Sequence, residues 1–174
     1  VGEAKERIRG AFASSHIMLP RKRITVNLAP ADVPKADSGF DLAIAVAIMA
    51  ADGQLGSGSS HQAGISGAFI GELGLDGNTR PVRGIIGRIL AGRSKGMHTF
   101  YIPAANLEQA RLVPHVKLVP IGSLAELYHG LRGEQFPKAL YSNKSGNIKP
   151  PAPDPPEVSL SEIVGQHRAK RALE

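Results

Sequence analysis

Apolar and polar residues repeat with two different periods in the first part of the chain. Residues 2–16 carry apolar side chains three to four positions apart, which predicts an amphipathic helix. Residues 21–30 alternate apolar with polar side chains and end at a proline, which predicts a strand. Residues 40–51 are apolar almost all round, so we expect a helix that is buried on most sides. The apolar positions of the first two segments are Ala4, Ile8, Ala11 and Phe12, and Ile24, Val26 and Leu28.

The middle of the chain contains a strong turn signal. Asp76, Gly77 and Asn78 separate two segments with extended character, so the pattern predicts two strands joined tightly there. Residues 54–64 are rich in glycine and serine and predict an exposed loop. Residues 84–95 predict a helix that ends at Gly96. Its inward residues are expected to be Ile85, Ile86, Ile89 and Leu90.

Strands and helices continue to alternate up to residue 132. Residues 98–104 and 116–121 predict strands, and residues 106–112 predict a short helix between them. Residues 123–133 predict a helix, with Ser123 as its N-cap. The expected fold class is therefore α/β, as a two-layer α+β domain over residues 1–132 whose sheet is covered by helices.

The character of the sequence changes after this domain. Residues 133–158 include five prolines between Pro150 and Pro156 and predict a semi-extended linker. Residues 159–174 restart a helical pattern that continues to Glu174, while the chain begins at Val1 without a methionine. We therefore expect a piece of a longer protein, with the first helix of a further module at its end.

Composition excludes several kinds of chemistry. The chain has no cysteine, which rules out disulfides, thiolate zinc sites and cysteine nucleophiles and favours a cytoplasmic location. The six histidines are never at metal-ligand spacing, so we expect no metal site. No apolar run approaches the roughly 20 residues of a membrane span, so no membrane partner is expected. No phosphate-binding loop of the G-x-x-x-x-G-K-[ST] type occurs, so these residues alone cannot complete a nucleotide hydrolysis site.

Positive charge is concentrated in one segment. Lys and Arg number 21 against 15 Asp and Glu, a formal charge of +6. Between Thr79 and Gly96 there are five basic residues and no acidic one. They are Arg80, Arg83, Arg88, Arg93 and Lys95. A solvated helix face and a contact with phosphates or an acidic partner both remain open for this cluster. A second basic group, residues 21–23, precedes the alternating segment.

The turn before residues 40–51 contains Lys35 and Ser38, the residue types of a Ser-Lys peptidase. Such an enzyme needs a lysine that burial keeps neutral within hydrogen-bond reach of the serine. Asp37 lies between them and favours a charged lysine. Capping of the helix by Asp37 or Ser38, with Asp41 in its first turn, is the simpler interpretation, although the peptidase alternative stays open.

Four stretches together resemble the magnesium-chelatase-like AAA+ ATPases of the ComM/YifB type. They are ITVNLAPADVPKADSGFDLAIAVAIMAADGQL, GELGLDGNTRPVRGI, YIPAANLEQA and SEIVGQHRAKRALE. The resemblance covers essentially the whole chain. It implies a front domain with a Lon-protease-like fold, related to a ribosomal-protein domain, followed by an ATPase module. It also implies strands before Val1.

For the complete protein, the resemblance implies ATP and magnesium as cofactors, and DNA and a ring of its own subunits as partners. Ile163, Val164 and Gly165 match part of the segment on the adenine side of the nucleotide pocket. The implied activity is ATP-driven DNA processing, namely branch migration in natural transformation. Lys35, Arg80, Arg83, Arg88 and Lys95 are the candidate DNA contacts.

Comparison with active Lon-type peptidases implies a catalytically silent domain. Phe40 or its neighbour falls where their serine lies, and Ile86 falls where their lysine lies, so neither position carries the required group. Two other functions remain as alternatives, a metal-chelatase subunit and a Ser-Lys peptidase with Ser38 as nucleophile. Chelatase subunits lack the Lon-like front domain, which argues against the first of these.

Overall fold

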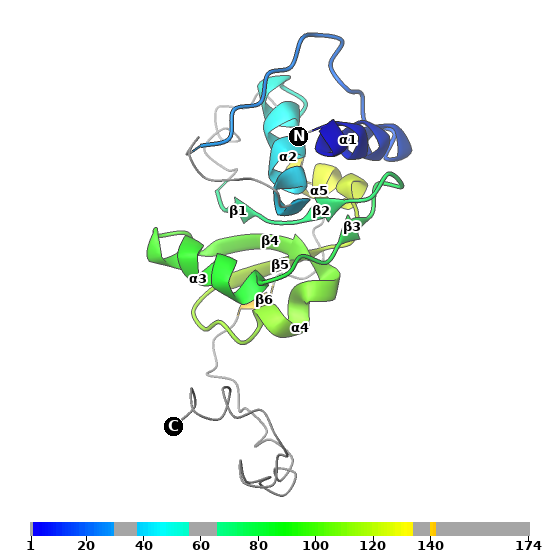
Figure 1. The fold of residues 1–174 in the computed structure, drawn as a ribbon. Helices are drawn as coiled ribbons and strands as arrows, with labels where there is room; N and C mark the ends of the chain where they lie inside the picture. The colour runs from blue at the N-terminus through cyan, green and yellow to red at the C-terminus, as the bar shows by residue number, and fades with distance from the viewer. Residues whose placement is uncertain (1, 30–37, 56–65, 134–139, 142–174) are drawn as a thin grey trace, which may run out of the picture.

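The computed structural model describes residues 2–29, 38–55, 66–133 and 140–141, and a four-stranded sheet lies at its centre (Figure 1). The strand order is β1-β4-β5-β6. The first three strands are parallel, whereas β6 is antiparallel to β5. The strands are β1 (Ala68–Phe69), β4 (Thr99–Pro103), β5 (Lys117–Ile121) and β6 (Leu140–Tyr141). The last strand lies within the range for which the sequence predicts a linker.

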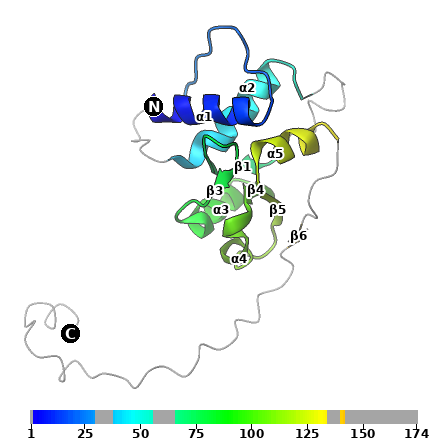
Figure 2. The ribbon, with the colours of Figure 1, turned by 90° about the vertical axis from the view of Figure 1, so that its right-hand side faces the viewer.

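Helices cover both faces of this sheet, as two views at right angles show (Figures 1 and 2). One face carries α1 (Gly2–Ser14), α2 (Asp41–Ala51) and α5 (Leu124–Leu131). The other carries α3 (Ile85–Ser94) and the short α4 (Leu107–Ala110), and two 3-10 turns, η1 (Ser38–Phe40) and η2 (Ala104–Asn106), lead into helices. The α/β prediction is confirmed, but the layers number three rather than two.

Side chains of the central strands alternate between two hydrophobic cores. In β4, Phe100 and Ile102 face the core beneath α3 and α4, whereas Tyr101 faces the core beneath α1, α2 and α5. In β5, Leu118 faces the core beneath α3 and α4, whereas Val119 faces the core beneath α1, α2 and α5. Because both faces of each strand are covered, both strands are apolar after their first residues, Thr99 and Lys117, rather than alternating, as is typical of parallel sheets.

The predicted tight turn joins β2 (Glu72–Leu73) to β3 (Thr79–Arg80), and the two strands pair antiparallel. Gly77 has φ of 81°, a conformation that glycine adopts without steric cost. The Ser123 cap of α5 is also confirmed, since its hydroxyl accepts a hydrogen bond from the Glu126 amide at 3.1 Å. Local sequence signals therefore predict both the β2–β3 turn and the start of α5.

The strand predicted over residues 21–30 is wrong for the residues described there. Residues 23–28 belong to no strand, and the side chains of Ile24 and Val26 are 41% and 48% exposed. A strand needs the backbone of a neighbour as well as an alternating pattern. Within residues 2–29, 38–55, 66–133 and 140–141, no backbone hydrogen bond pairs this segment with another strand.

The predicted inward face of α3 is half right. Ile85 and Ile89 are buried, but Ile86 and Leu90 are 36% and 41% exposed. The helix turns its 85, 89 and 92 row toward the sheet, because Gly92 permits close approach to the Phe100 ring. A Cβ atom at Gly92 would lie 2.6 Å from Cε1 of Phe100. Gly96, with φ of 83°, follows the helix as predicted.

Candidate nucleic-acid interface

A buried asparagine fixes the entrance to α3. The Asn106 side chain is almost fully buried, and its Oδ1 accepts from the Val82 amide at 2.9 Å. Its Nδ2 donates to the Val82 carbonyl at 3.0 Å. Both backbone groups of Val82 are thus satisfied by one side chain, which holds Arg83 at the start of the helix. Asn106 was not among the predicted site residues, and its place at the end of the short turn after β4, between a buried strand and a helix, was the available signal.

Arg80 is held by the turn that precedes it. Its Nη2 lies 3.2 Å from Oδ2 of Asp76. The Asp76 carboxylate also accepts from the side chain and backbone of Asn78 at 2.9 and 3.1 Å. The side-chain hydrogen bond from Asn78 is the largest cause that lowers the pKa of Asp76, with its backbone amide next and Arg80 a smaller contributor. The charge of Arg80 is therefore largely compensated locally.

Arg83 and Arg88 come together at the first turn of α3. Arg83 is exposed and precedes Gly84, which has φ of 66°. The half-buried Arg88 donates from Nε to the Arg83 carbonyl at 3.2 Å. This bond draws the Arg88 side chain back toward the helix entrance, beside the backbone of Arg83.

Lys95 lies at the opposite end of the same helix. It is the C-cap residue of α3 and is exposed. A helix of ten residues is about 15 Å long. Lys95 is therefore separated from Arg83 by the length of the helix. Arg93, near Lys95, donates from Nη1 to the Pro114 carbonyl at 2.9 Å and ties the helix end to the next loop.

The electrostatic character of α3 follows from these placements. No acidic residue occurs between Gly77 and Leu107. Arg83 and Lys95 make no ion pair with any residue in the part of the chain that the structure describes. Exposed cations at both ends of one rigid helix can contact separate phosphates of a polyanion. The exposed Ile86 and Leu90 add an apolar strip between them.

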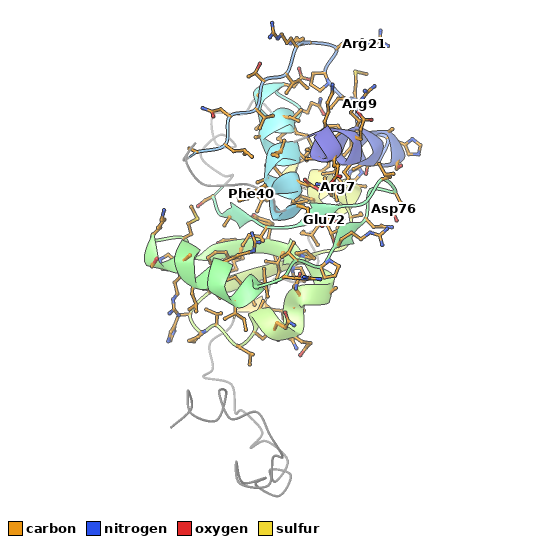
Figure 3. The ribbon with its side chains drawn as sticks, viewed as in Figure 1. Arg7, Arg9, Arg21, Phe40, Glu72 and Asp76 are labelled. Atoms are coloured by element: carbon orange, nitrogen blue, oxygen red, sulfur yellow. The ribbon has the colours of Figure 1, made fainter. Side chains whose placement is uncertain are left out.

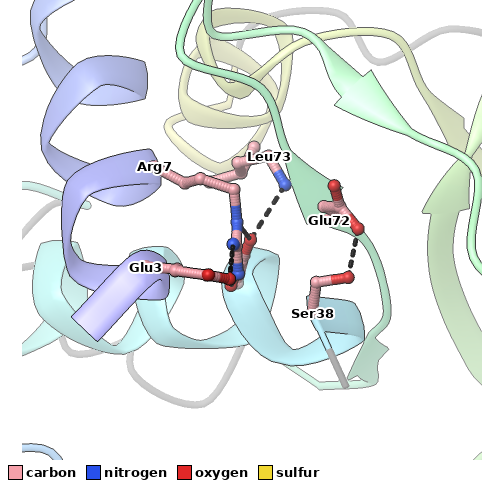
Figure 4. A network of polar contacts seen from close by, with 6 residues as sticks. Glu3, Arg7, Ser38, Glu72 and Leu73 are labelled. Carbon is pink, nitrogen blue, oxygen red and sulfur yellow. Dashed lines mark hydrogen bonds and ion pairs between the residues drawn. The ribbon is translucent and has the colours of Figure 1, made fainter. Parts of the chain in front are cut away.

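The entrance of α2 carries a polar network in place of the predicted cap (Figure 4). The N-cap residue is Phe40, without a side-chain cap bond, and the Ser38 hydroxyl donates to the Glu72 carboxylate. Capping by Ser38 is therefore wrong, whereas Asp41 does lie in the first turn. Asp41 is buried and accepts from Arg7 Nε at 2.7 Å and from the Leu73 amide at 3.3 Å. Competition from Glu72 explains why Ser38 does not cap the helix.

A groove of about 1130 Å³ runs past this network. Its walls come from α1, from residues 19–28 and from α2. Figure 3 shows Arg7 and Glu72 beside the α2 entrance, with Arg9 and Arg21 farther out. Half of the groove residues are apolar, and the charged ones carry both signs: Glu3, Lys5, Arg7, Arg9, Lys22, Arg23, Asp41 and Glu72.

Several sequence predictions lie outside the described residues. Lys35, the partner of Ser38 in the peptidase hypothesis, is one of them, as are Asp37 and the adenine-side segment Ile163, Val164 and Gly165. Among the residues that the structure describes, no group of three or more His, Asp or Glu side chains is placed to hold a metal ion. No helix in the same part of the chain is both long and apolar enough to cross a membrane.

Comparison with known proteins identifies relatives along the whole chain. Residues 1–106 match the family model "Subunit ChlI of Mg-chelatase". The competence protein ComM of Haemophilus influenzae is 37% identical over 174 residues, which cover 99% of this chain and 33% of that protein. YifB of Escherichia coli is 32% identical over 174 residues, covering 100% of this chain and 32% of that protein. Rv2897c of Mycobacterium tuberculosis is 31% identical over 173 residues, covering 99% and 32%.

The chain thus spans about a third of the length of the curated relatives that it matches. The family model covers more than half of the chain and includes α1, α2, the hairpin and α3. The chain therefore belongs to the magnesium-chelatase ChlI-like family, in the group that contains ComM and YifB.

Proposed function

We propose that this chain is a non-catalytic domain of a larger cytoplasmic ATPase that processes DNA, and that α3 contacts the phosphate backbone. Phe40 and Ile86 carry neither a hydroxyl nor an amine, which supports a domain without peptidase chemistry. ATP hydrolysis, magnesium binding and assembly into a ring belong to the complete protein in this proposal. Branch migration during natural transformation is the proposed activity.

The carrying observation is the charge distribution of α3. Arg83 precedes the helix, and its carbonyl accepts a hydrogen bond from Arg88. Lys95 follows the last turn, and residues 78–106 contain no Asp or Glu. Phosphate contacts from such residues do not depend on base sequence, which suits an ATPase that acts on any DNA. Arg80 contributes less, because Asp76 already pairs with it.

DNA binding by the 174-residue chain tests this proposal. We expect salt-sensitive binding of a fluorescent duplex at low ionic strength, with affinity that drops at least about tenfold in Arg83→Glu/Arg88→Glu. The two reversals change the net charge by four units, so the control must do the same elsewhere. Arg9→Glu/Arg132→Glu changes two exposed residues on α1 and after α5, on the opposite face of the sheet.

The comparison of these two variants separates a local contact from a general charge effect. We expect the α1 and α5 variant to retain most of the affinity. Equal losses in both variants would assign the binding to net charge alone, and no binding by the unaltered chain at low salt would refute the DNA contact. Fluorescence anisotropy at two salt concentrations is sufficient for the measurement.

A metal-chelatase subunit is the second candidate, because the matching family model is described as a chelatase subunit. In that case the complete protein would support insertion of magnesium into a porphyrin when mixed with partner chelatase subunits and ATP. We expect no such activity. Its appearance in an absorbance assay, together with its loss when the protein is omitted, would favour the chelatase function over DNA processing.

A further inference from the structure

The second basic group, residues 21–23, is anchored to the C-terminal end of α2. Nζ of Lys22 lies 3.5 Å from Oδ1 of Asp52, the C-cap residue of that helix. Gln54 donates from Nε2 to the Met18 carbonyl at 2.7 Å and to Oδ2 of Asp52 at 2.9 Å. These contacts hold the basic segment against α2, although residues 21–23 belong to no helix or strand.

Most of the positive charge at this place has no local counter-charge. Arg21 and Arg23 are exposed, and neither forms an ion pair with a carboxylate of the described residues. The same is true of Lys5 on α1, which lines the same groove as Arg23. The three acidic residues of the groove already contact Arg7 or Ser38. Adjacent like charges repel each other, so a bound polyanion would stabilise this segment.

Residues 21–23 and α3 lie on opposite sides of the molecule. In two views at right angles, the segment runs along the outer side of α1 and α2, whereas α3 lies across the sheet (Figures 1 and 2). Figure 3 accordingly shows Arg21 at the end of the molecule that is remote from α3. One helix layer is about 10–12 Å thick, which exceeds the screening length of about 8 Å at physiological ionic strength. The two basic surfaces therefore act as separate sites.

We infer that residues 21–23 form a second DNA contact, so that the domain binds two DNA segments at once, one on each face of its sheet. Arg and Lys side chains contact phosphates of any sequence. Duplex DNA has a persistence length of about 50 nm, so one short duplex cannot bend around the domain to reach both surfaces. This inference rests on the proposed contact between α3 and DNA, and it adds a second DNA segment as a partner.

The second contact is expected to be weaker than the first. Lys22 already shares its charge with Asp52, and residues 21–23 form no regular element. Arg83 and Lys95, in contrast, flank one rigid helix and have no acidic neighbour in the sequence. A single short duplex therefore binds mainly at α3, and the second surface is occupied when another DNA segment is present.

Capture of a second duplex tests this arrangement. One duplex is immobilised on beads, the 174-residue chain is bound to it at low ionic strength, and a fluorescent duplex is then added. We expect the bound chain to capture the fluorescent duplex. Arg21→Glu/Arg23→Glu should capture at least about tenfold less of it, while its affinity for the immobilised duplex stays within about threefold of that of the unaltered chain.

A matched variant and the first binding step decide between the explanations. Arg9→Glu/Arg132→Glu makes the same change in net charge on the same face of the sheet and should retain the capture. Equal loss of capture in this variant would overturn the inference. Capture that persists in Arg21→Glu/Arg23→Glu would overturn it too, because several copies bound through α3 would then bridge the two duplexes.

Failure of this inference is distinguishable from failure of the α3 contact. If the unaltered chain binds the immobilised duplex but captures no second one, the domain has a single DNA surface and only the present inference is refuted. If the unaltered chain does not bind the immobilised duplex at all, both the α3 contact and the second contact are refuted.

Discussion

Arg7 and Asp41 form an ion pair that joins two helices, with Nε of Arg7 2.7 Å from Oδ2 of Asp41. The Asp41 side chain is 1% exposed, and Arg7 is 22% exposed. The hydrogen bond to Asp41 is the largest cause that raises the pKa of Arg7. This contact holds α1 against the first turn of α2 and, through the Leu73 amide, against β2.

We expect Arg7→Met to lower the free energy of unfolding by about 3 kcal/mol, because it leaves the Asp41 carboxylate buried without its cation. Urea unfolding at neutral pH measures this change. Arg9→Met is the matched control on the same helix. Arg9 is exposed and its nearest carboxylate, in Glu6, is 3.8 Å away, so the expected cost is at most about 0.5 kcal/mol. Equal losses of unfolding free energy in Arg7→Met and Arg9→Met would contradict a stabilising role of the Arg7–Asp41 ion pair.

Two glycines of α3 give opposite predictions. Gly92→Ala should destabilise the protein by about 1–3 kcal/mol, since the new Cβ would lie 2.6 Å from the Phe100 ring. Gly87→Ala should stabilise it by up to about 1 kcal/mol, because nothing outside its chain neighbours and its own helix backbone lies within 4 Å of the added Cβ, and alanine favours the helix. Thermal unfolding of both variants checks the pair, and a stable Gly92→Ala would mean that α3 lies farther from β4.

Adjacent isoleucines test the orientation of the same helix. Ile85→Ala removes a side chain that is 1% exposed and should cost about 2–5 kcal/mol. Ile86→Ala removes one that is 36% exposed and should cost much less, within about 1 kcal/mol. Urea denaturation of the two variants compares them directly. The reverse order of stabilities would restore the inward orientation that the sequence predicted for Ile86.

Asn78 should control the acid titration of Asp76. The Asn78 side chain is the largest cause that lowers the pKa of Asp76 below its ordinary value of 3.8. Asn78→Ala removes this donor, so the pKa should rise toward 3.8, while the backbone amide of residue 78 remains. NMR titration of the Asp76 carboxylate measures the change, and an unaltered pKa would mean that Arg80 dominates instead.

The same pair gives a pH dependence of stability. A carboxylate whose pKa is lowered by folding stabilises the protein above its unfolded pKa, and this contribution disappears as the pH falls through the folded pKa. In Asn78→Ala the two pKa values approach each other. The loss of stability between about pH 5 and pH 2 should therefore be smaller in the variant than in the unaltered protein. A steeper acid dependence in the variant would contradict this sign.

Local signals predicted most of the fold. The turn at Asp76–Asn78, the Ser123 cap and the period of α1 each depend on neighbouring residues, so the sequence alone could place them. The inward face of α3 depends on Phe100, which is distant in the sequence. Its ring lies so close to Gly92 that only the helix face containing Gly92 fits against the sheet. The alternation in residues 21–30 predicted a strand, but a strand also requires a neighbour that no local pattern reveals, and residues 23–28 belong to no strand.

In the candidate interface, too, features that depend on neighbouring residues were predictable, whereas contacts between distant residues were not. Sequence reasoning found the basic residues of α3 because their excess is visible without coordinates. Three contacts could not be predicted in this way. Asp76 forms an ion pair with Arg80, and the Arg88 side chain donates to the Arg83 carbonyl. Asn106 binds the backbone of Val82, 24 positions away in the sequence. Likewise, serine is a residue type that often caps helices, but the Ser38 hydroxyl donates to the carboxylate of Glu72 in β2. Contacts between distant residues decided each of these cases.

The alternation of Phe100, Tyr101 and Ile102 makes the sheet a partition between two separately packed compartments. Substitutions under α3 and substitutions under α1 should therefore combine additively, because they share few neighbours. The surface of α3 can accordingly be redesigned, for tighter or weaker DNA contact, without rebuilding the compartment that contains the Arg7–Asp41 pair.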